Sequence, residues 1–327
     1  MKRSYLLLTL LLMLVGCSPA DTGETTTSLG AVTTTAAPTT TAPVETTTTA
    51  EIGFPATVEA DDGAVTVATR PEAIISLSSV ATEMLFAIGA GPQVVAVDDQ
   101  SNYPADAPMT DLSGITPNLE GILSYEPDLV IISFDPGDLV AGLNAAGVPV
   151  ISYGAALTIE DVYRQIQGLG LATGNLDLAA KVNQQIQGDL EQIVAASGGA
   201  AQDLTYFHEI DNTLYTVTST TFFGEIYGLF GLTSIADPAD EDGLAFGYPQ
   251  LSSEFVVEAD PDLIFLADTL YGENAETVAA RPGWAPMRAV QTGNIVELDS
   301  DVASRWGPRI VDLARAIADA IAEYRSG

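Results

Sequence analysis

Two stretches of the chain follow the same pattern, NLEGILSYEPDLVII at residues 118–132 and SSEFVVEADPDLIFL at residues 252–266. In each copy a polar residue and a Glu begin a segment with helical spacing. A Pro ends that segment, because its ring cannot continue the hydrogen-bond ladder of a helix. The apolar run after each Pro-Asp pair is typical of a buried parallel strand. A helix–turn–strand unit that is used twice predicts two lobes built on one plan.

A second pair of segments precedes these copies in the same order. The segment at residues 82–89 reads TEMLFAIG, and its counterpart at residues 224–231 reads GEIYGLFG. Both predict apolar helices that end at a Gly, the residue that most readily takes the left-handed conformation of a helix C-cap. Two matches in the same order strengthen the prediction of a duplicated fold.

Short apolar segments alternate with segments of helical spacing along most of the remaining chain. Strands are expected at residues 74–77, 94–97, 129–133, 148–152, 204–207, 214–217, 263–266 and 295–298. This alternation predicts the α/β class, with two Rossmann-like lobes that each contain a parallel sheet. We place the N-terminal lobe at residues 54–157 and the C-terminal lobe, with its final helix, at residues 198–327.

The segment between the two lobes, residues 158–197, predicts one long connecting helix. Thr158 and Asp161 have the spacing of a capping box at its start, and apolar residues then recur at helical spacing as far as Ile193. Thr173-Gly174-Asn175 is the point at which this pattern allows a break or a kink. The fold expected is therefore two lobes joined by a helical backbone.

The N-terminus is expected to be a targeting segment. Lys2 and Arg3 precede an apolar run at residues 6–15 that is too short to span a membrane, so residues 1–17 predict a signal peptide. It ends in LVGC, which resembles the lipobox of bacterial lipoproteins, and Cys17 is therefore expected to carry a lipid anchor. Residues 18–53 are rich in Thr and poor in large apolar side chains, which predicts a disordered tether.

The charge and the rare residues exclude several classes of function. The chain has 11 Lys and Arg against 44 Asp and Glu, which argues against nucleic acid and anionic membrane surfaces as partners. His208 is the only His and Cys17 the only Cys. A zinc site of this kind needs several His ligands, and an iron–sulfur cluster needs several Cys ligands. A hydrolase triad needs a nucleophile motif in addition to its His. We expect no enzyme activity, metal site or cofactor, and we expect His208 to be packed and poorly placed for a ligand.

Several motifs occur in one order along the chain: ISLSS at 75–79 with TE at 82–83, SNYP at 101–104, NLE at 118–120 with PDLVI at 127–131, SE at 253–254 with PDLI at 261–264, and LDSD at 298–301 with GPR at 307–309. Together they resemble the iron-siderophore and cobalamin family of ABC-transporter substrate-binding lipoproteins, whose class III members have a helical backbone. The resemblance covers residues from about Arg70 to the C-terminus.

This resemblance implies an extracytoplasmic, lipid-anchored monomer that captures a small metal chelate in the groove between its lobes. The chelate would then pass to the transmembrane permease subunits of an ABC importer. Glu120 and Glu254, one in each lobe, are expected to contact arginines of the permease. Because ligand crevices lie at the carboxyl ends of parallel strands, the residues expected to contact the ligand are Ser79, Tyr103, Phe134, Tyr248 and Arg305.

The ligand itself stays open at this stage. We rank a ferric siderophore first, cobalamin second and haem third. Gly114 and Thr116 occupy a loop in which some cobalamin binders place an aromatic residue, which argues slightly against cobalamin. A structural or adhesive surface lipoprotein is the alternative from a different class, because it would share the anchor and the tether.

Overall fold

A computed structural model describes residues 53–198, 201 and 203–326. The predicted signal peptide, Cys17 and residues 18–52 of the predicted tether lie outside the described residues. The described chain begins with an antiparallel hairpin of β1 (Ala56–Ala60) and β2 (Gly63–Val67), as the turn residues between them suggest.

The first parallel sheet has the strand order β4-β3-β5-β6. Its strands are β3 (Ile74–Leu77), β4 (Val94–Val97), β5 (Leu129–Ile132) and β6 (Val150–Ser152). The helices of this lobe are α1 (Ser79–Ala87), α2 (Leu119–Leu123) and α3 (Leu139–Ala145). Every residue of β3 and β5 is buried, because helices cover both faces of the sheet.

The second parallel sheet repeats this plan with the order β10-β9-β7-β8. Its strands are β7 (Thr205–Glu209), β8 (Thr233–Ser234), β9 (Leu263–Leu266) and β10 (Ile295–Glu297). The helices of this lobe are α6 (Phe222–Gly228), α7 (Ser253–Ala259), α8 (Ala275–Ala279), α9 (Arg288–Thr292), α10 (Ser300–Ser304) and α11 (Ile310–Ser326). In each lobe the first strand lies between the second and the third. The predicted fold class is confirmed.

The duplicated Pro-Asp pairs have the same structural task in both lobes. The Asp128 carboxylate accepts hydrogen bonds from the backbone N–H groups of Glu72 (2.8 Å) and Ala73 (3.1 Å), immediately before β3. The Asp262 carboxylate accepts from the backbone N–H (2.9 Å) and the hydroxyl (3.1 Å) of Thr205, at the start of β7. Each Asp thus satisfies backbone N–H groups at the start of the neighbouring strand.

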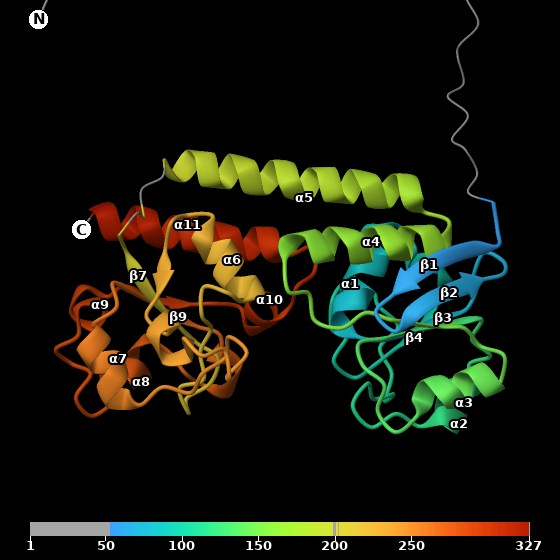
Figure 1. Cartoon of the computed structure of the whole chain (residues 1–327), viewed down its shortest axis with the longest axis horizontal. Helices are drawn as coiled ribbons and strands as arrows, with labels where there is room; N and C mark the ends of the chain where they lie inside the picture. Colours follow the sequence, from blue (N-terminus) through green and yellow to red (C-terminus); the bar gives the residue numbers. More distant parts are fainter. Residues whose placement is uncertain (1–52, 199–200, 202, 327) are drawn as a thin grey trace, which may run out of the picture. The chain divides into compact units, whose positions relative to one another are not determined.

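The connecting segment breaks at Thr173-Gly174-Asn175, the point at which the sequence pattern allowed a break. It forms two helices, α4 (Ile159–Thr173) and α5 (Leu176–Ser197), instead of one. The expected capping box at Thr158 and Asp161 is present, but Gly174 takes a left-handed conformation with φ 76° and ends α4. As a result α5 folds back along α4 and then runs along α11 (Figure 1). The lobe boundaries at residues 157 and 198 stay predictions.

One predicted strand is wrong. Residues 214–217 contain only an isolated bridge, between Tyr215 and Gln250. The strand that pairs with β7 at Thr205 and Tyr206 is β8. The segment instead forms part of a loop at the carboxyl end of the second sheet, where it contributes no ladder.

Candidate ligand-binding site

A cavity of about 670 Å³ lies at the carboxyl ends of strands from both sheets. Its first-lobe wall comes from loops that follow β3, β4 and β5, and its second-lobe wall comes from segments that follow β7, β9 and β10. Side chains that leave the carboxyl ends of parallel strands converge in this way, and ligands of α/β proteins usually bind there. The size is within the usual range for small-molecule sites, ≈ 300–1,000 Å³.

Four of the five predicted contact residues line this cavity: Ser79, Phe134, Tyr248 and Arg305. Phe134 comes from the first lobe and is 49% exposed, whereas Tyr248 comes from the second lobe and is 40% exposed. These two rings therefore offer apolar surface to the cavity from opposite walls. The structure brings together these four residues, which lie up to 226 positions apart in the chain.

Tyr103 is separated from the other four. It lines a different pocket, together with Phe86 and residues of α5 and α11. Its ring lies under the guanidinium of Arg309, with 4.4 Å between Cζ and the ring centroid. The hydroxyl of Ser101 donates to Asp98 at 2.6 Å and so fixes the start of this loop. This position gives no support to a ligand contact by Tyr103.

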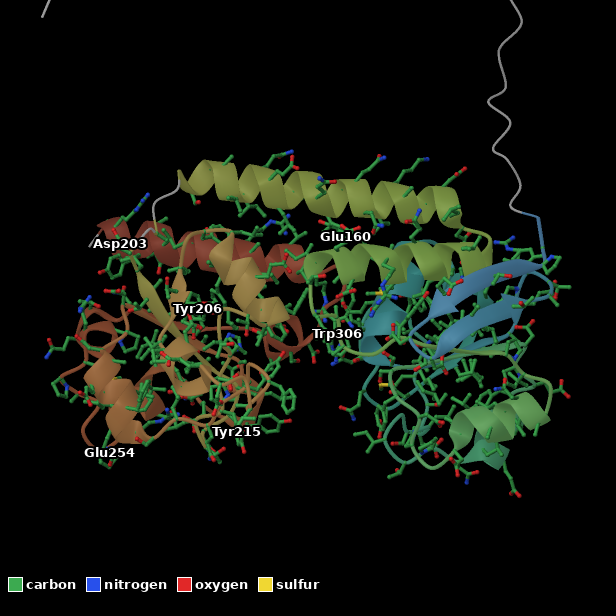
Figure 2. The ribbon with its side chains drawn as sticks, viewed as in Figure 1. Glu160, Asp203, Tyr206, Tyr215, Glu254 and Trp306 are labelled. Atoms are coloured by element: carbon green, nitrogen blue, oxygen red, sulfur yellow. The ribbon has the colours of Figure 1, made fainter. Side chains whose placement is uncertain are left out.

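Three further aromatic residues, which are not among the five predicted contacts, also line the cavity. Phe223 lies at the start of α6, Tyr271 follows β9, and Trp306 follows α10. Tyr271 is 83% exposed, and the half-buried Trp306 lies where the second lobe approaches the first (Figure 2). A sequence signal existed for Tyr271 and Trp306, because they follow a strand and a short helix at the carboxyl edge of the sheet. A cavity wall with several exposed aromatic rings suits a large ligand with planar or apolar faces.

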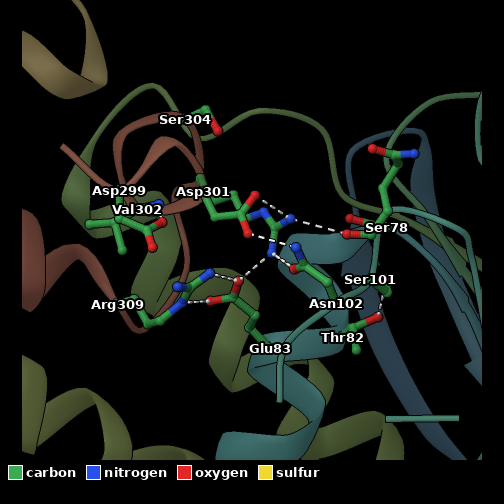
Figure 3. A network of polar contacts seen from close by, with 12 residues as sticks. Ser78, Thr82, Glu83, Ser101, Asn102, Asp299, Asp301, Val302, Ser304 and Arg309 are labelled. Atoms are coloured by element: carbon green, nitrogen blue, oxygen red, sulfur yellow. Dashed lines mark hydrogen bonds and ion pairs between the residues drawn. The ribbon is translucent and has the colours of Figure 1, made fainter. Parts of the chain in front are cut away.

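Arg305 is the only Lys or Arg among the described residues that line the cavity, and it is bound by the protein itself. Its Nη1 donates to Glu83 (2.9 Å) and Asn102 (2.9 Å), and its Nη2 donates to the backbone oxygen of Gln100 (3.0 Å) and to Asp301 (2.8 Å) (Figure 3). A guanidinium has five N–H donors, so these four bonds leave one. Arg305 therefore has little capacity to neutralise an anionic ligand.

The other charged groups of the cavity wall are acidic. Asp98 and Asp301 line it beside Arg305. Burial raises the pKa of the Asp98 carboxyl, while the hydrogen bond from Ser101 acts in the opposite direction. An anion that entered this cavity would meet carboxylates and a guanidinium already paired with them. The electrostatics favour a neutral or cationic ligand.

His208 is packed, as expected, but it also lies in the wall of this cavity, which the sequence did not predict. It is only 1% exposed, and its Nδ1 is 2.9 Å from the hydroxyl of Tyr227. Burial lowers the pKa of its imidazole to about 4, so the ring is neutral at pH 7. His208 lies near the carboxyl end of β7, and that end of the strand faces the cavity. This position was the sequence signal for His208.

The cavity can now be compared with known proteins. The model of the periplasmic binding protein family matches residues 74–302, which is more than half of the chain. The chain belongs to the periplasmic binding protein family. Its members are substrate-binding transport proteins and not enzymes, so this protein is a binding component of the ABC importer type. The adhesive or structural alternative is therefore set aside.

Individual relatives of this binding protein have different descriptions. An uncharacterized ABC transporter substrate-binding lipoprotein of Bacillus subtilis is 29% identical, over 82% of this chain and 86% of the relative. A cobalamin-binding protein of Halobacterium salinarum is 30% identical, over 82% of this chain and 74% of the relative. The crystal structure of a periplasmic haem-binding protein of Vibrio cholerae matches with a TM-score of 0.66 at 23% identity, over 77% of this chain and 98% of that one. The fold is the class III periplasmic binding fold.

Substrate-binding proteins of this type work with permease subunits. The two residues predicted to meet a permease, Glu120 and Glu254, occupy the second positions of α2 and α7. Both side chains are exposed. The capping residues Asn118 and Ser252 each accept a hydrogen bond from the backbone three residues ahead, so the two helix starts are built alike. Figure 1 shows α2 and α7 on the side opposite to α5. Among the described residues, no helix is long and apolar enough to cross a membrane.

Proposed function

We propose that this binding protein captures a cobalamin-type corrinoid outside the cytoplasm and delivers it to the permease of an ABC importer. The observation that carries this proposal is the state of Arg305, whose guanidinium is committed to Glu83, Asn102, Gln100 and Asp301. The cavity therefore offers aromatic surface and neutral polar groups, but hardly any positive charge.

Because the cavity offers hardly any positive charge, we place cobalamin ahead of a ferric siderophore, which the sequence alone ranked first. Many ferric siderophores are anionic, and haem carries two carboxylates, so both would need basic partners at the site. A corrinoid carries neutral amide groups around a large ring system, which matches an aromatic cavity with uncharged donors. Ile115, 67% exposed, adds apolar surface from the loop in which some cobalamin binders place an aromatic residue. The cobalamin-binding relative of Halobacterium salinarum supports the same choice.

Gly114 explains why that loop has no large residue at this position. A Cβ placed there would lie 2.5 Å from the backbone oxygen of Leu77 and 2.9 Å from the Asp98 carboxylate. Both distances are shorter than a Cβ contact allows, so only Gly fits. The loop therefore supplies its apolar contact from the next residue, Ile115.

The proposal is tested by titrating the full chain, as its Cys17→Ala variant, with cyanocobalamin, a ferric hydroxamate, a ferric catecholate and haemin. Trp306 lines the cavity, so quenching of Trp fluorescence reports binding. We expect cyanocobalamin to bind with a Kd below about 1 µM, which corresponds to about −8 kcal/mol. Tight binding of an anionic ferric chelate or haemin, with no binding of cyanocobalamin, would overturn the proposal.

A further inference from the structure

The His208 ring contacts two residues of α6 in addition to lining the cavity. Along β7, Tyr206 and His208 point to one face of the sheet, and Phe207 and Glu209 point to the other. On the first face the His208 ring stacks with Phe223, with ring centroids 5.8 Å apart. Its Nδ1 meets the Tyr227 hydroxyl at 2.9 Å. The imidazole is therefore held by two residues of α6 while it lines the cavity.

Hydrogen-bond accounting decides which ring nitrogen carries the proton. If the Tyr227 hydroxyl donates to Nδ1, then Nδ1 is the acceptor and the proton of the neutral ring sits on Nε2. If Nδ1–H donates instead, the Tyr227 hydroxyl proton needs another acceptor. Tyr227 is 0% exposed, and no second partner for its hydroxyl is found among the described residues. The second arrangement leaves a buried donor unpaired, which is costly, so the first is favoured.

The tyrosine cannot turn away to relieve this constraint. The Tyr227 ring stacks on the Tyr206 ring, with 4.0 Å between the ring centroids. It also packs against the Phe265 ring, with 5.0 Å between the ring centroids. Burial raises the pKa of its hydroxyl well above 10, so the proton stays on the oxygen. The phenol is therefore a rigid donor toward Nδ1, and the His208 ring has one orientation and one tautomer.

We propose that His208 is a specificity-determining residue whose Nε2–H is a fixed, uncharged donor toward an amide carbonyl oxygen of the ligand. This inference rests on the proposed function, since it takes the amide-rich rim of a corrinoid as the acceptor. The same tautomer excludes metal coordination by His208. Because a proton occupies Nε2, this nitrogen has no lone pair with which to coordinate the metal of a bound chelate. His208 would thus contact the periphery of the ligand and would not coordinate its metal.

The tautomer can be measured without any ligand. Because the chain contains one His, ¹⁵N-His labelling of the full chain, made without a histidine tag, gives a single imidazole. We expect its spectrum to show a protonated Nε2 and an unprotonated Nδ1 throughout pH 6 to 8. Tyr227→Phe should convert this to a mixture of tautomers, because the donor to Nδ1 is lost. A wild-type ring protonated at Nδ1 would overturn the inference.

Affinity measurements test the contact itself. His208→Phe keeps an aromatic ring but removes the donor, whereas His208→Gln keeps an N–H donor of similar reach. We expect the Phe variant to bind cyanocobalamin about tenfold more weakly and the Gln variant to bind within about threefold of wild type. Circular dichroism and the melting temperature of both variants confirm that they fold. Equal affinity of the Phe variant and the wild type would contradict the proposal.

A spectroscopic readout separates the donor role from metal ligation. The visible absorption of aquocobalamin reports on its axial ligands, and we expect no change that depends on His208 when it binds. A shift that His208→Gln abolishes would show that Nε2 coordinates cobalt, which overturns the inference. If cobalamin does not bind but another chelate does, the proposed function fails. The same two variants, measured with that chelate, then still decide the role of His208.

Discussion

Arg305 donates to Glu83 at 2.9 Å and joins the segment after α10 in the second lobe to α1 in the first. Arg309 binds the same carboxylate through two hydrogen bonds, of 2.9 and 2.6 Å (Figure 3). The Glu83 side chain is 1% exposed, and those of Arg305 and Arg309 are 9% and 17% exposed. Two guanidinium groups therefore share one buried carboxylate at the junction of the lobes, beside the cavity.

Removing the charge of Glu83 should destabilise the protein strongly. Glu83→Gln leaves two largely buried guanidinium groups without their shared anion, and we expect the free energy of unfolding to fall by about 3 kcal/mol. The matched control is Asp312→Asn, which breaks the exposed ion pair with Arg315. That variant should lose less than about 1 kcal/mol. Urea unfolding of both variants measures the difference, and equal losses would contradict a special role for the Glu83 network.

Tyr248 and Tyr103 provide a matched pair of variants for the position of the site. Tyr248 lines the cavity, whereas Tyr103 lies against Arg309 outside it. Tyr248→Ala should weaken ligand binding at least about tenfold, because it removes a large aromatic contact. Tyr103→Ala should leave the affinity within about twofold of wild type. If the fluorescence titration shows the larger loss for Tyr103, the ligand lies elsewhere.

Charge reversal of Glu120 and Glu254 tests the permease contact. We expect the double variant with Arg at both positions to lose cellular uptake of the ligand, because like charges would then face the predicted arginines of the permease. The Kd of the purified protein should stay unchanged, since neither residue lines the cavity. Glu258→Arg, at an exposed site on the same helix α7, is the control and should transport normally. A loss of ligand affinity in the double variant would point to a different role.

Cys17→Ala tests the predicted anchor. Cys17 is the only Cys of the chain, so no other residue can replace it as the site of thiol acylation. We expect the variant to move from the membrane fraction to the soluble fraction of fractionated cells, since the apolar segment alone is too short to act as a mature membrane span. A processed variant that stays with the membrane would show that another contact holds the protein there.

His208 should make stability depend on pH in a defined direction. Burial lowers the pKa of its imidazole from 6.5 to about 4, so between these values the unfolded chain binds more protons than the folded protein. The stability that His208 contributes is therefore present above pH 6.5 and is lost as the pH falls toward 4, by about 3 kcal/mol in total. The measurement is the free energy of unfolding of wild type and His208→Gln across this range. A constant difference between the two would contradict the lowered pKa.

Local sequence patterns predict the two lobes and most of their helices and strands. Apolar runs that follow the Pro-Asp pairs at 127–128 and 261–262 predict buried strands, and Gly89 takes the left-handed conformation expected just after a helix. Gly231 is also left-handed, but α6 ends at Gly228 and a turn separates the two residues. These are local signals, in which neighbouring residues alone restrict the backbone. They also placed Ser79, Phe134 and Tyr248 at the edge of the sheets where the cavity lies, because the carboxyl ends of parallel strands converge by geometry.

The chemistry of that cavity depends on contacts between residues that are far apart in the chain and that only folding brings together. The sequence predicts a ligand contact for Arg305, but its partner Glu83 lies 222 residues away, and no local pattern reports that pairing. The loop of Tyr103 turns onto Arg309, and His208 gains its donor from Tyr227, for the same reason. Gly174 is an intermediate case, since helical spacing continues on both sides of it and packing against α11 selects the fold-back of α5. The hydrogen bonds and ion pairs of a polar side chain depend on which distant groups the folded chain brings to it. A sequence pattern reports only on residues that are neighbours in the chain.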